Sequence, residues 1–323
     1  MSETAGIHLD SGLWIDRPDA LEAIAAKQAR GELPPADAES LRRFATDGYL
    51  VFDLGVPEST LDGLVAGVDR IWRERPDDLA YAYDGPARRF SRADEARERQ
   101  RRYRIHDPHS HLDEALALYL EPELHRRVEQ VLGEEAVAIQ SLFFEFGSEQ
   151  TLHRDPMVVP TGAPGHMVAA WIALEEISPD CGALVYVPGS HRLPYYEFAP
   201  GEWMFDGSRM GAAEVEAALA WNDALQRERG LAPRLFTARK GQALLWHASL
   251  THGGAPVADP DSTRRSFVVH YSTRRTYLER SITVAEPGED GAERPRVWAT
   301  TELVERSGRR GFANPLSGAP RGT

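Results

Sequence analysis

The chain has 323 residues, of which 42% are hydrophobic, so it can bury a large core and is not expected to be disordered. A formal net charge of −13 argues against a nucleic-acid partner, because phosphate binding requires a clustered basic surface. With one cysteine, an intramolecular disulfide is impossible. The sequence shows no secretory signal and no apolar run of about 18 residues, so we expect a cytoplasmic protein with no membrane partner. It is expected to be a monomer or a homodimer.

The first part of the chain, residues 17–135, is predicted to be mostly helical with one strand. Apolar residues recur at helical spacing in most of it, whereas residues 49–52 form a short apolar run after Gly48 that is typical of a strand. The arginine-rich stretch 88–104 also contains acids, which favours a solvated helical face. An anion-binding role for this stretch is the alternative.

The period of the apolar residues changes at residue 136. Short runs rich in β-branched and aromatic residues alternate with glycine and proline, which is typical of strands in a sandwich or jelly roll. The prediction is a single, mainly β domain with a jelly-roll core over 136–280, a helical insertion at about 205–230 and a C-terminal extension, 281–323, that packs loosely over the barrel or frays.

A first pair of candidate metal ligands, His153 and Asp155, follows a predicted strand. In an extended chain, residues i and i+2 point to the same side, so an imidazole and a carboxylate can reach one metal ion. The pattern is weak by itself, because His-x-Asp is common by chance. Gln150, three residues earlier, could aim its amide towards a bound ligand or lie at a solvated strand edge.

A third candidate ligand, His252, lies about a hundred residues further on and precedes Gly253 and Gly254. Glycines after a ligand allow a sharp turn and a close approach of the backbone to a metal or co-substrate. Two histidines and one carboxylate form the facial triad of non-haem Fe(II) oxygenases, which leaves positions open for a co-substrate and O₂.

A candidate anion-binding residue, Arg264, opens the predicted strand that follows. A guanidinium that faces into a barrel requires an anion, and its planar fork suits the distal carboxylate of 2-oxoglutarate. Arg265 is the rival, because strand alternation lets only one of the two face inward. The spacing to the end of the strand favours Arg264.

The combination of these motifs resembles the phytanoyl-CoA dioxygenase family over about residues 36–275. The resemblance implies a double-stranded β-helix core with flanking helices, with Fe(II) as cofactor and 2-oxoglutarate and O₂ as co-substrates. It also implies that Trp171 lies in the co-substrate pocket. The resemblance rests on Gln150-x-x-His153-x-Asp155, Ala170-Trp171-Ile172, Val187-Pro188-Gly189, His252-Gly253-Gly254 and Arg264.

The predicted function is an Fe(II)/2-oxoglutarate-dependent dioxygenase, with oxidation of a small-molecule C–H bond and release of succinate and CO₂. Asp155 favours hydroxylation, or a desaturation or ring-forming variant, over chlorination. A secondary metabolite or a small acid is the expected substrate, enclosed by aromatic residues of 77–106 and 194–232. The alternatives are a cupin-like metal enzyme without 2-oxoglutarate, and a non-catalytic jelly-roll binding protein.

The other histidines and the cysteine are expected outside the metal site. His247 should face the opposite side of its strand from His252, and His270 is interpreted as a buried core histidine. His191 is expected to stabilise a turn, and His166 either to line the pocket or to be structural. Cys181 has no basic neighbour to lower its pKa, so a nucleophilic role is not expected.

Overall fold

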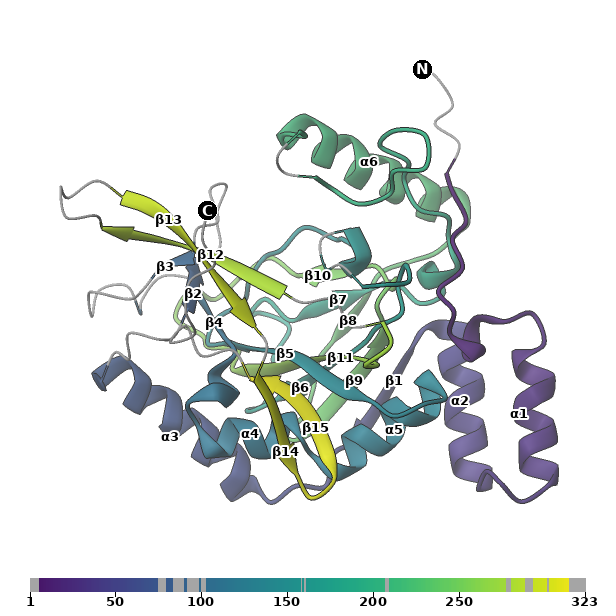
Figure 1. Ribbon diagram of the computed structural model, residues 1–323, viewed down its shortest axis with the longest axis horizontal. Coiled ribbons are helices and arrows are strands. Elements are labelled where there is room, and N and C mark those ends of the chain that lie inside the picture. Colours follow the sequence, from purple (N-terminus) through teal and green to yellow (C-terminus); the bar gives the residue numbers. More distant parts are fainter. Residues whose placement is uncertain are drawn as a thin grey trace.

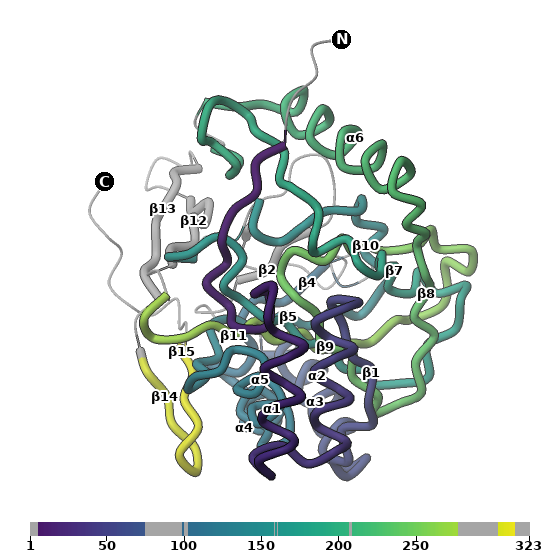
Figure 2. The backbone as a smooth tube through the Cα atoms, turned by 90° about the vertical axis from the view of Figure 1, so that its right-hand side faces the viewer, coloured from purple at the N-terminus to yellow at the C-terminus, as the bar shows by residue number. Residues whose placement is uncertain are grey.

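The structure is a computed structural model that describes residues 6–74, 80–83, 90–91, 99, 103–157, 159, 161–206, 209–276, 280–287, 293–300 and 302–313. Figure 1 shows strands in the middle of the molecule, with helices α1 to α5 on one side of them and α6 on the other. Figure 2 shows the N-terminal segment running from the α6 side down to α1, and Ile7 forms a bridge with Tyr195 on the way.

Five helices cover one side of the strands: α1 (Ala20–Ala29), α2 (Pro35–Asp47), α3 (Glu58–Glu74), α4 (Asp113–Tyr119) and α5 (Pro122–Leu132). The ends of α5 show why the sequence folds this way. Pro122 occupies its first turn, where no N–H is needed, and the Glu121 carboxylate accepts a bond from the Leu124 N–H. Gly133 ends the helix at φ 74°. Among the described residues, no helix has both the length and the apolar character to cross a membrane.

The larger sheet has the strand order β1-β9-β6-β11-β5-β4-β2-β3-β12-β13, and β15 joins it by pairing with β5. The smaller sheet has the order β10-β7-β8. The strands are β1 (Tyr49–Asp53), β2 (Ala80–Tyr83), β3 (Phe90–Ser91), β4 (Tyr103–His106), β5 (Val137–Phe144), β6 (Val168–Ala173), β7 (Leu184–Tyr186), β8 (Arg234–Phe236), β9 (Gln242–His247), β10 (His252–Gly254), β11 (Ser266–Ser272), β12 (Arg280–Pro287), β13 (Glu293–Thr300), β14 (Glu302–Arg306) and β15 (Arg309–Ala313).

The central strands β5, β6 and β11 of the larger sheet are buried along their whole length, and most of their residues are apolar. Side chains of one parity, such as Phe143 and Phe267, pack against the helices. Those of the other parity, such as Trp171 and Val268, pack against Leu184 and other residues of the smaller sheet. Two sheets facing each other across an apolar interior form the predicted mainly β jelly roll.

The helical insertion is confirmed as α6 (Ala212–Glu228), but two predictions about the flanking regions are wrong. The lead-in contains β2, β3 and β4 in addition to β1. The arginine-rich stretch hides β4: Arg104 is a strand residue only 5% exposed, not part of a solvated helix. Much of 88–104 lies outside the described residues. At the other end of the chain, β15 is hydrogen-bonded to β5, so this part of the C-terminal extension belongs to the sheet.

A buried histidine beneath the sheet makes stability depend on pH. His125 of α5 is 1% exposed and packs edge-on against Tyr271, and burial lowers its pKa from 6.5 to about 4. The unfolded chain therefore binds this proton more readily than the folded chain. The contribution of His125 to stability is complete above about pH 6.5 and is lost as the pH falls towards 4.

Between pH 7 and pH 4, the free energy of unfolding should fall in both the wild type and the His125→Leu variant. The fall should be about 3 kcal/mol larger in the wild type. Urea unfolding at stepped pH measures this difference. Replacement of the exposed His8 by glutamine is the control and should leave the pH dependence of the wild type unchanged. Equal slopes for the wild type and His125→Leu would contradict the assignment.

Candidate metal centre

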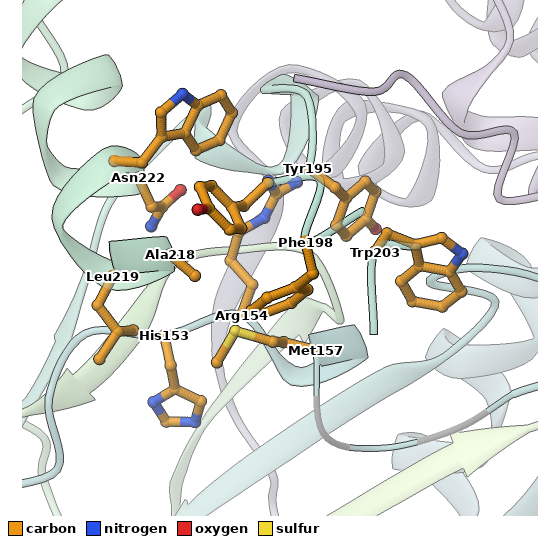
Figure 3. A pocket seen from close by; sticks show the side chains of 11 residues that line it. His153, Arg154, Met157, Tyr195, Phe198, Trp203, Ala218, Leu219 and Asn222 are labelled. Atoms are coloured by element: carbon orange, nitrogen blue, oxygen red, sulfur yellow. The ribbon is translucent and has the colours of Figure 1, made fainter. Parts of the chain in front are cut away.

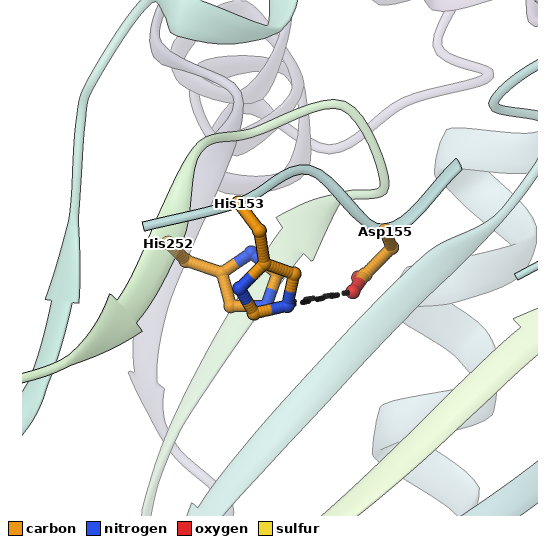
Figure 4. Close-up of side chains that lie close together, drawn as sticks. All are labelled: His153, Asp155 and His252. Atoms are coloured by element: carbon orange, nitrogen blue, oxygen red, sulfur yellow. Dashed lines mark ion pairs between the residues drawn. The ribbon is translucent and has the colours of Figure 1, made fainter. Parts of the chain in front are cut away.

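Two histidines and one aspartate converge where the loop after β5 meets β10. His153 and His252 form an antiparallel bridge, with N···O distances of 2.8 and 3.0 Å between their backbones. Figure 4 shows the three side chains pointing toward one another. One ligand atom from each of His153, Asp155 and His252 lies within 4.8 Å of the other two. Within the described residues this is the one group of three or more such side chains placed to hold a metal ion.

The convergence does not arise from strand alternation as the sequence suggested. His153 pairs with His252 through its backbone, but Asp155 already begins a 3₁₀ turn, Asp155–Met157. The Asp155 N–H donates to the carbonyl of Ala248, at 3.2 Å, which ties this turn to the segment before His252. The three predicted residues do converge, but Asp155 reaches the histidines from a 3₁₀ turn and not from an extended chain.

Gly253 and Gly254 also act differently from the expectation. They continue β10 instead of making a sharp turn, and they pack against the loop 148–152. A Cβ atom on Gly253 would lie 2.5 Å from the carbonyl oxygen of Gln150, and one on Gly254 would lie 2.8 Å from the backbone nitrogen of Glu149. The glycines therefore allow the two backbones that carry the candidate ligands to approach each other.

Both imidazoles are oriented by backbone carbonyl groups. The Nδ1 atoms of His153 and His252 lie 2.8 Å from the carbonyl oxygen of Thr151 and 3.0 Å from that of Leu250. A carbonyl can only accept, so each Nδ1 carries a proton, and in the neutral imidazole each Nε2 then presents a lone pair. The Nε2 atoms lie 3.7 and 3.5 Å from Oδ1 of Asp155. Two neutral nitrogen donors and one carboxylate oxygen fit an iron(II) ion.

The surroundings keep these groups in their ligand forms. Burial lowers the pKa of His252 to about 4, so its imidazole is neutral at neutral pH. The other carboxylate oxygen of Asp155, Oδ2, accepts a bond from the Trp246 indole N–H at 3.1 Å. This bond leaves Oδ1 facing the two histidines.

The two rival arginines lie on opposite faces of the sheet. Arg264 is 2% exposed and turned into the barrel, where its guanidinium lies 5.3 Å from the Phe144 ring centre and 5.8 Å from that of Trp171. Arg265 lies on the other face and forms ion pairs of 3.4 Å with Glu145 and with Glu175. Arg264 is therefore the one of the two arginines that faces inward.

The remaining predicted site residues lie near this centre in different ways. Trp171 is 1% exposed inside the barrel and packs edge-on against Phe236, 5.6 Å between ring centres. Gln150 takes part through its backbone: its carbonyl accepts the N–H of Gly254, at 2.9 Å, while its side chain is partly exposed.

His270 was interpreted as a core histidine, yet it borders the candidate centre. Its Nε2 lies 4.0 Å from Oδ2 of Asp155, and its ring lies edge-on to Trp246. The signal was available in the sequence, because His270 has the parity of Arg264 on β11 and so shares its inward face. Arg104 and His106 of β4 were also missed, since a helix was expected there; His106 lies 3.3 Å from the Gln140 amide nitrogen.

The other side chains lie away from the centre. His247 faces the opposite side, as expected, with Nε2 3.0 Å from Asp16, and His191 lies 3.3 Å from the Ala45 carbonyl. His166 is buried against the Ser11 carbonyl, at 2.8 Å, so it is structural. Burial raises the pKa of the Cys181 thiol, although Arg264, a basic neighbour that the sequence did not predict, partly lowers it.

Fold and site together define a jelly-roll protein with a two-histidine, one-carboxylate centre, the architecture of non-haem iron, 2-oxoglutarate-dependent oxygenases. The family model for phytanoyl-CoA dioxygenase (PhyH) matches residues 44–266. The chain belongs to this family, which confirms the resemblance drawn from its motifs. Fe(II) and 2-oxoglutarate are the cofactor and co-substrate of this class.

Similar proteins agree with the assignment. The chain is 27% identical over 142 residues to phytanoyl-CoA dioxygenase domain-containing protein 1 of Danio rerio, a match that covers 42% of this chain and 44% of that protein. The chain thus spans less than half the length of this relative.

Two solved structures share the fold. They are the α-ketoglutarate-dependent carbocyclase SnoK (TM-score 0.56, 19% identity, 75% of this chain and 84% of that chain) and the epimerase SnoN from nogalamycin biosynthesis, in complex with Fe³⁺, α-ketoglutarate and nogalamycin RO (TM-score 0.55, 18% identity, 92% and 99%).

The Gly253→Ala substitution should destabilise the protein by about 1–3 kcal/mol, because the added methyl group forces β10 away from Gln150. Urea unfolding at neutral pH measures the loss. Gly63→Ala is the control: there the new Cβ atom meets only the flexible side chain of Glu114, at 3.2 Å. If both variants were as stable as the wild type, the close backbone approach would not constrain the site.

Proposed function

We propose that this protein is an Fe(II)/2-oxoglutarate-dependent dioxygenase that hydroxylates an unactivated C–H bond of a small molecule. The observation that carries the proposal is the convergence of two Nε2 lone pairs, from His153 and His252, on one carboxylate oxygen of Asp155. These three side chains would hold the iron. Membership of the phytanoyl-CoA dioxygenase family supports the class of reaction.

Iron(II) held there, with 2-oxoglutarate and O₂, supplies an oxidation in which the keto acid becomes succinate and CO₂. The chain contributes orientation. The carbonyls of Thr151 and Leu250 fix the two imidazole tautomers, and the Trp246 N–H fixes the carboxylate. Because three donors come from the protein, coordination positions stay available for the co-substrates.

Arg264 would hold the distal carboxylate of 2-oxoglutarate. Its guanidinium is inside the barrel, between aromatic rings and on the strand face that His270 shares. Its planar fork matches a carboxylate, which can accept two parallel N–H bonds from it. Trp171 would form one wall of the same pocket, and Gln150 would position the loop that carries His153.

Further parts of the proposal follow from composition and from the fold. Asp155 fills the carboxylate position, which favours hydroxylation over chlorination. The acidic net charge of −13 supports a small-molecule substrate over a nucleic acid. The pairing of β1 with β9 and of β15 with β5 supports a single domain. We propose a cytoplasmic monomer or homodimer.

Removal of one ligand should weaken iron binding strongly. In an anaerobic titration of metal-free protein with Fe(II) and then 2-oxoglutarate, we expect a visible metal-to-ligand charge-transfer band. Asp155→Ala should weaken Fe(II) binding by at least about 100-fold. Loss of a group that only hydrogen-bonds a metal ligand lowers metal affinity about 10–100-fold, and loss of the ligand itself should lower it more. Asp223→Ala, on the exposed face of α6, is the control. An unchanged band in Asp155→Ala would disprove the ligand assignment.

The matched pair Arg264→Ala and Arg265→Ala tests the co-substrate site. Loss of charge-assisted hydrogen bonds to a carboxylate should weaken 2-oxoglutarate binding about 10–100-fold in Arg264→Ala only. The charge-transfer band, titrated with 2-oxoglutarate at saturating Fe(II), gives both affinities. Iron binding without any band in the wild type would instead indicate a metal enzyme that does not use 2-oxoglutarate.

A further inference from the structure

A pocket walled by aromatic side chains lies beside His153, beneath α6. The empty space in and around it, counted out to open solvent, is about 350 Å³. Figure 3 shows His153 at one end, Met157 and Phe198 on one side, and Asn222 of α6 on the other. Any molecule held in this pocket therefore lies next to a candidate iron ligand.

The walls of this pocket contain two groups of packed rings. Tyr196 packs against Phe198, at 5.1 Å between ring centres, and against Trp221 of α6, at 5.7 Å. Tyr195 packs against Trp203, at 5.6 Å. Aromatic side chains offer large, rigid surfaces with faces and edges of opposite partial charge, so they bind another ring with a favourable geometry.

The pocket offers no cation to an acidic ligand. Among its lining residues Arg154 carries the fixed charge, but its guanidinium already donates to the carbonyls of Ser249 (2.9 Å), Pro194 (2.7 Å) and Leu193 (2.9 Å). The same group lies over the Tyr195 ring, at 4.2 Å. Arg154 thus holds the wall together, and a carboxylate entering the pocket would be desolvated without an ionic partner.

One polar atom in the wall lacks a partner. Asn222 is 7% exposed, and its side-chain N–H group donates to the Thr251 hydroxyl at 3.2 Å. Its carbonyl oxygen, Oδ1, is buried without a hydrogen bond. A buried acceptor without a partner costs free energy, which a ligand carrying an O–H or N–H group would recover.

We infer that this pocket binds a neutral, ring-containing small molecule that carries a hydrogen-bond donor, with Asn222 Oδ1 as the acceptor. This inference deepens the proposed function and rests on it, since it places such a ring beside the iron as the substrate to be oxidised. It selects among the substrates considered from the sequence: a small acid does not fit, whereas a phenolic or N–H-bearing aromatic compound does.

Three probes that share one ring system test the inference: naphthalen-2-ol, 2-methoxynaphthalene and naphthalene-2-carboxylate. Calorimetric titration of the full-length, metal-free protein at neutral pH should show naphthalen-2-ol binding about tenfold tighter than 2-methoxynaphthalene, because one hydrogen bond separates them. The carboxylate should bind weakest. Tightest binding by the carboxylate, or equal binding by all three probes, would overturn the inference.

Two variants locate the binding site. Trp221→Ala should weaken both neutral probes at least tenfold, while Trp14→Ala, a similarly half-buried indole that packs on Gly133, should not. Asn222→Leu should abolish the preference for naphthalen-2-ol over 2-methoxynaphthalene and leave the affinity for the latter nearly unchanged. Retention of the preference in Asn222→Leu would show that Asn222 is not the acceptor.

The iron titration separates this inference from the proposed function. Trp221→Ala should keep the charge-transfer band of the wild type, because Trp221 lies outside the triad. A band in the wild type without binding of the neutral probes would overturn the inference alone. Binding of the probes without any band would overturn the proposed function and would leave the pocket as a ligand site.

Discussion

The site depends on the two-bond backbone bridge between His153 and His252. These residues are about a hundred positions apart, and the bridge is what turns them into neighbours with rings 4.6 Å apart. It requires glycines on the β10 side, because a Cβ atom at Gly253 would displace the Gln150 carbonyl. The convergence of the candidate ligand side chains is therefore a consequence of backbone packing.

The alternation of side chains along the strands of the jelly roll decides which residues face the interior beside this bridge. On β11, residues of one parity face the helices and those of the other parity face the barrel. The same alternation sends Arg264 and His270 inward and gives Arg265 its two carboxylate partners outside. The strand alternation that sorts the apolar side chains of the core therefore also places Arg264 and His270 inside the barrel.

The insertion α6 gives the site its individual character. A helix packed on a core usually buries a stripe of apolar side chains. The buried residues of α6 are instead Ala218, Asn222 and Gln226, which are small or carry an amide. The Asn222 amide reaches Thr251, next to His252, so this surface helix is hydrogen-bonded to the strand of a candidate ligand. A helix of this kind is suited to lining a ligand pocket, which the N-terminal helices, packed on the core, are not.

The sequence by itself determined the class of fold, the three residues that converge and which of the two arginines faces inward, because strand periodicity and the ligand motifs can be read from the order of the residues. It failed at Arg104 and β4, where a run of arginines masked a strand buried by its neighbours. It could not show that Asp155 reaches the histidines from a 3₁₀ turn, or that His270 borders them. Those features, and the pocket under α6, were decided by tertiary structure, since each depends on contacts between segments far apart in the chain.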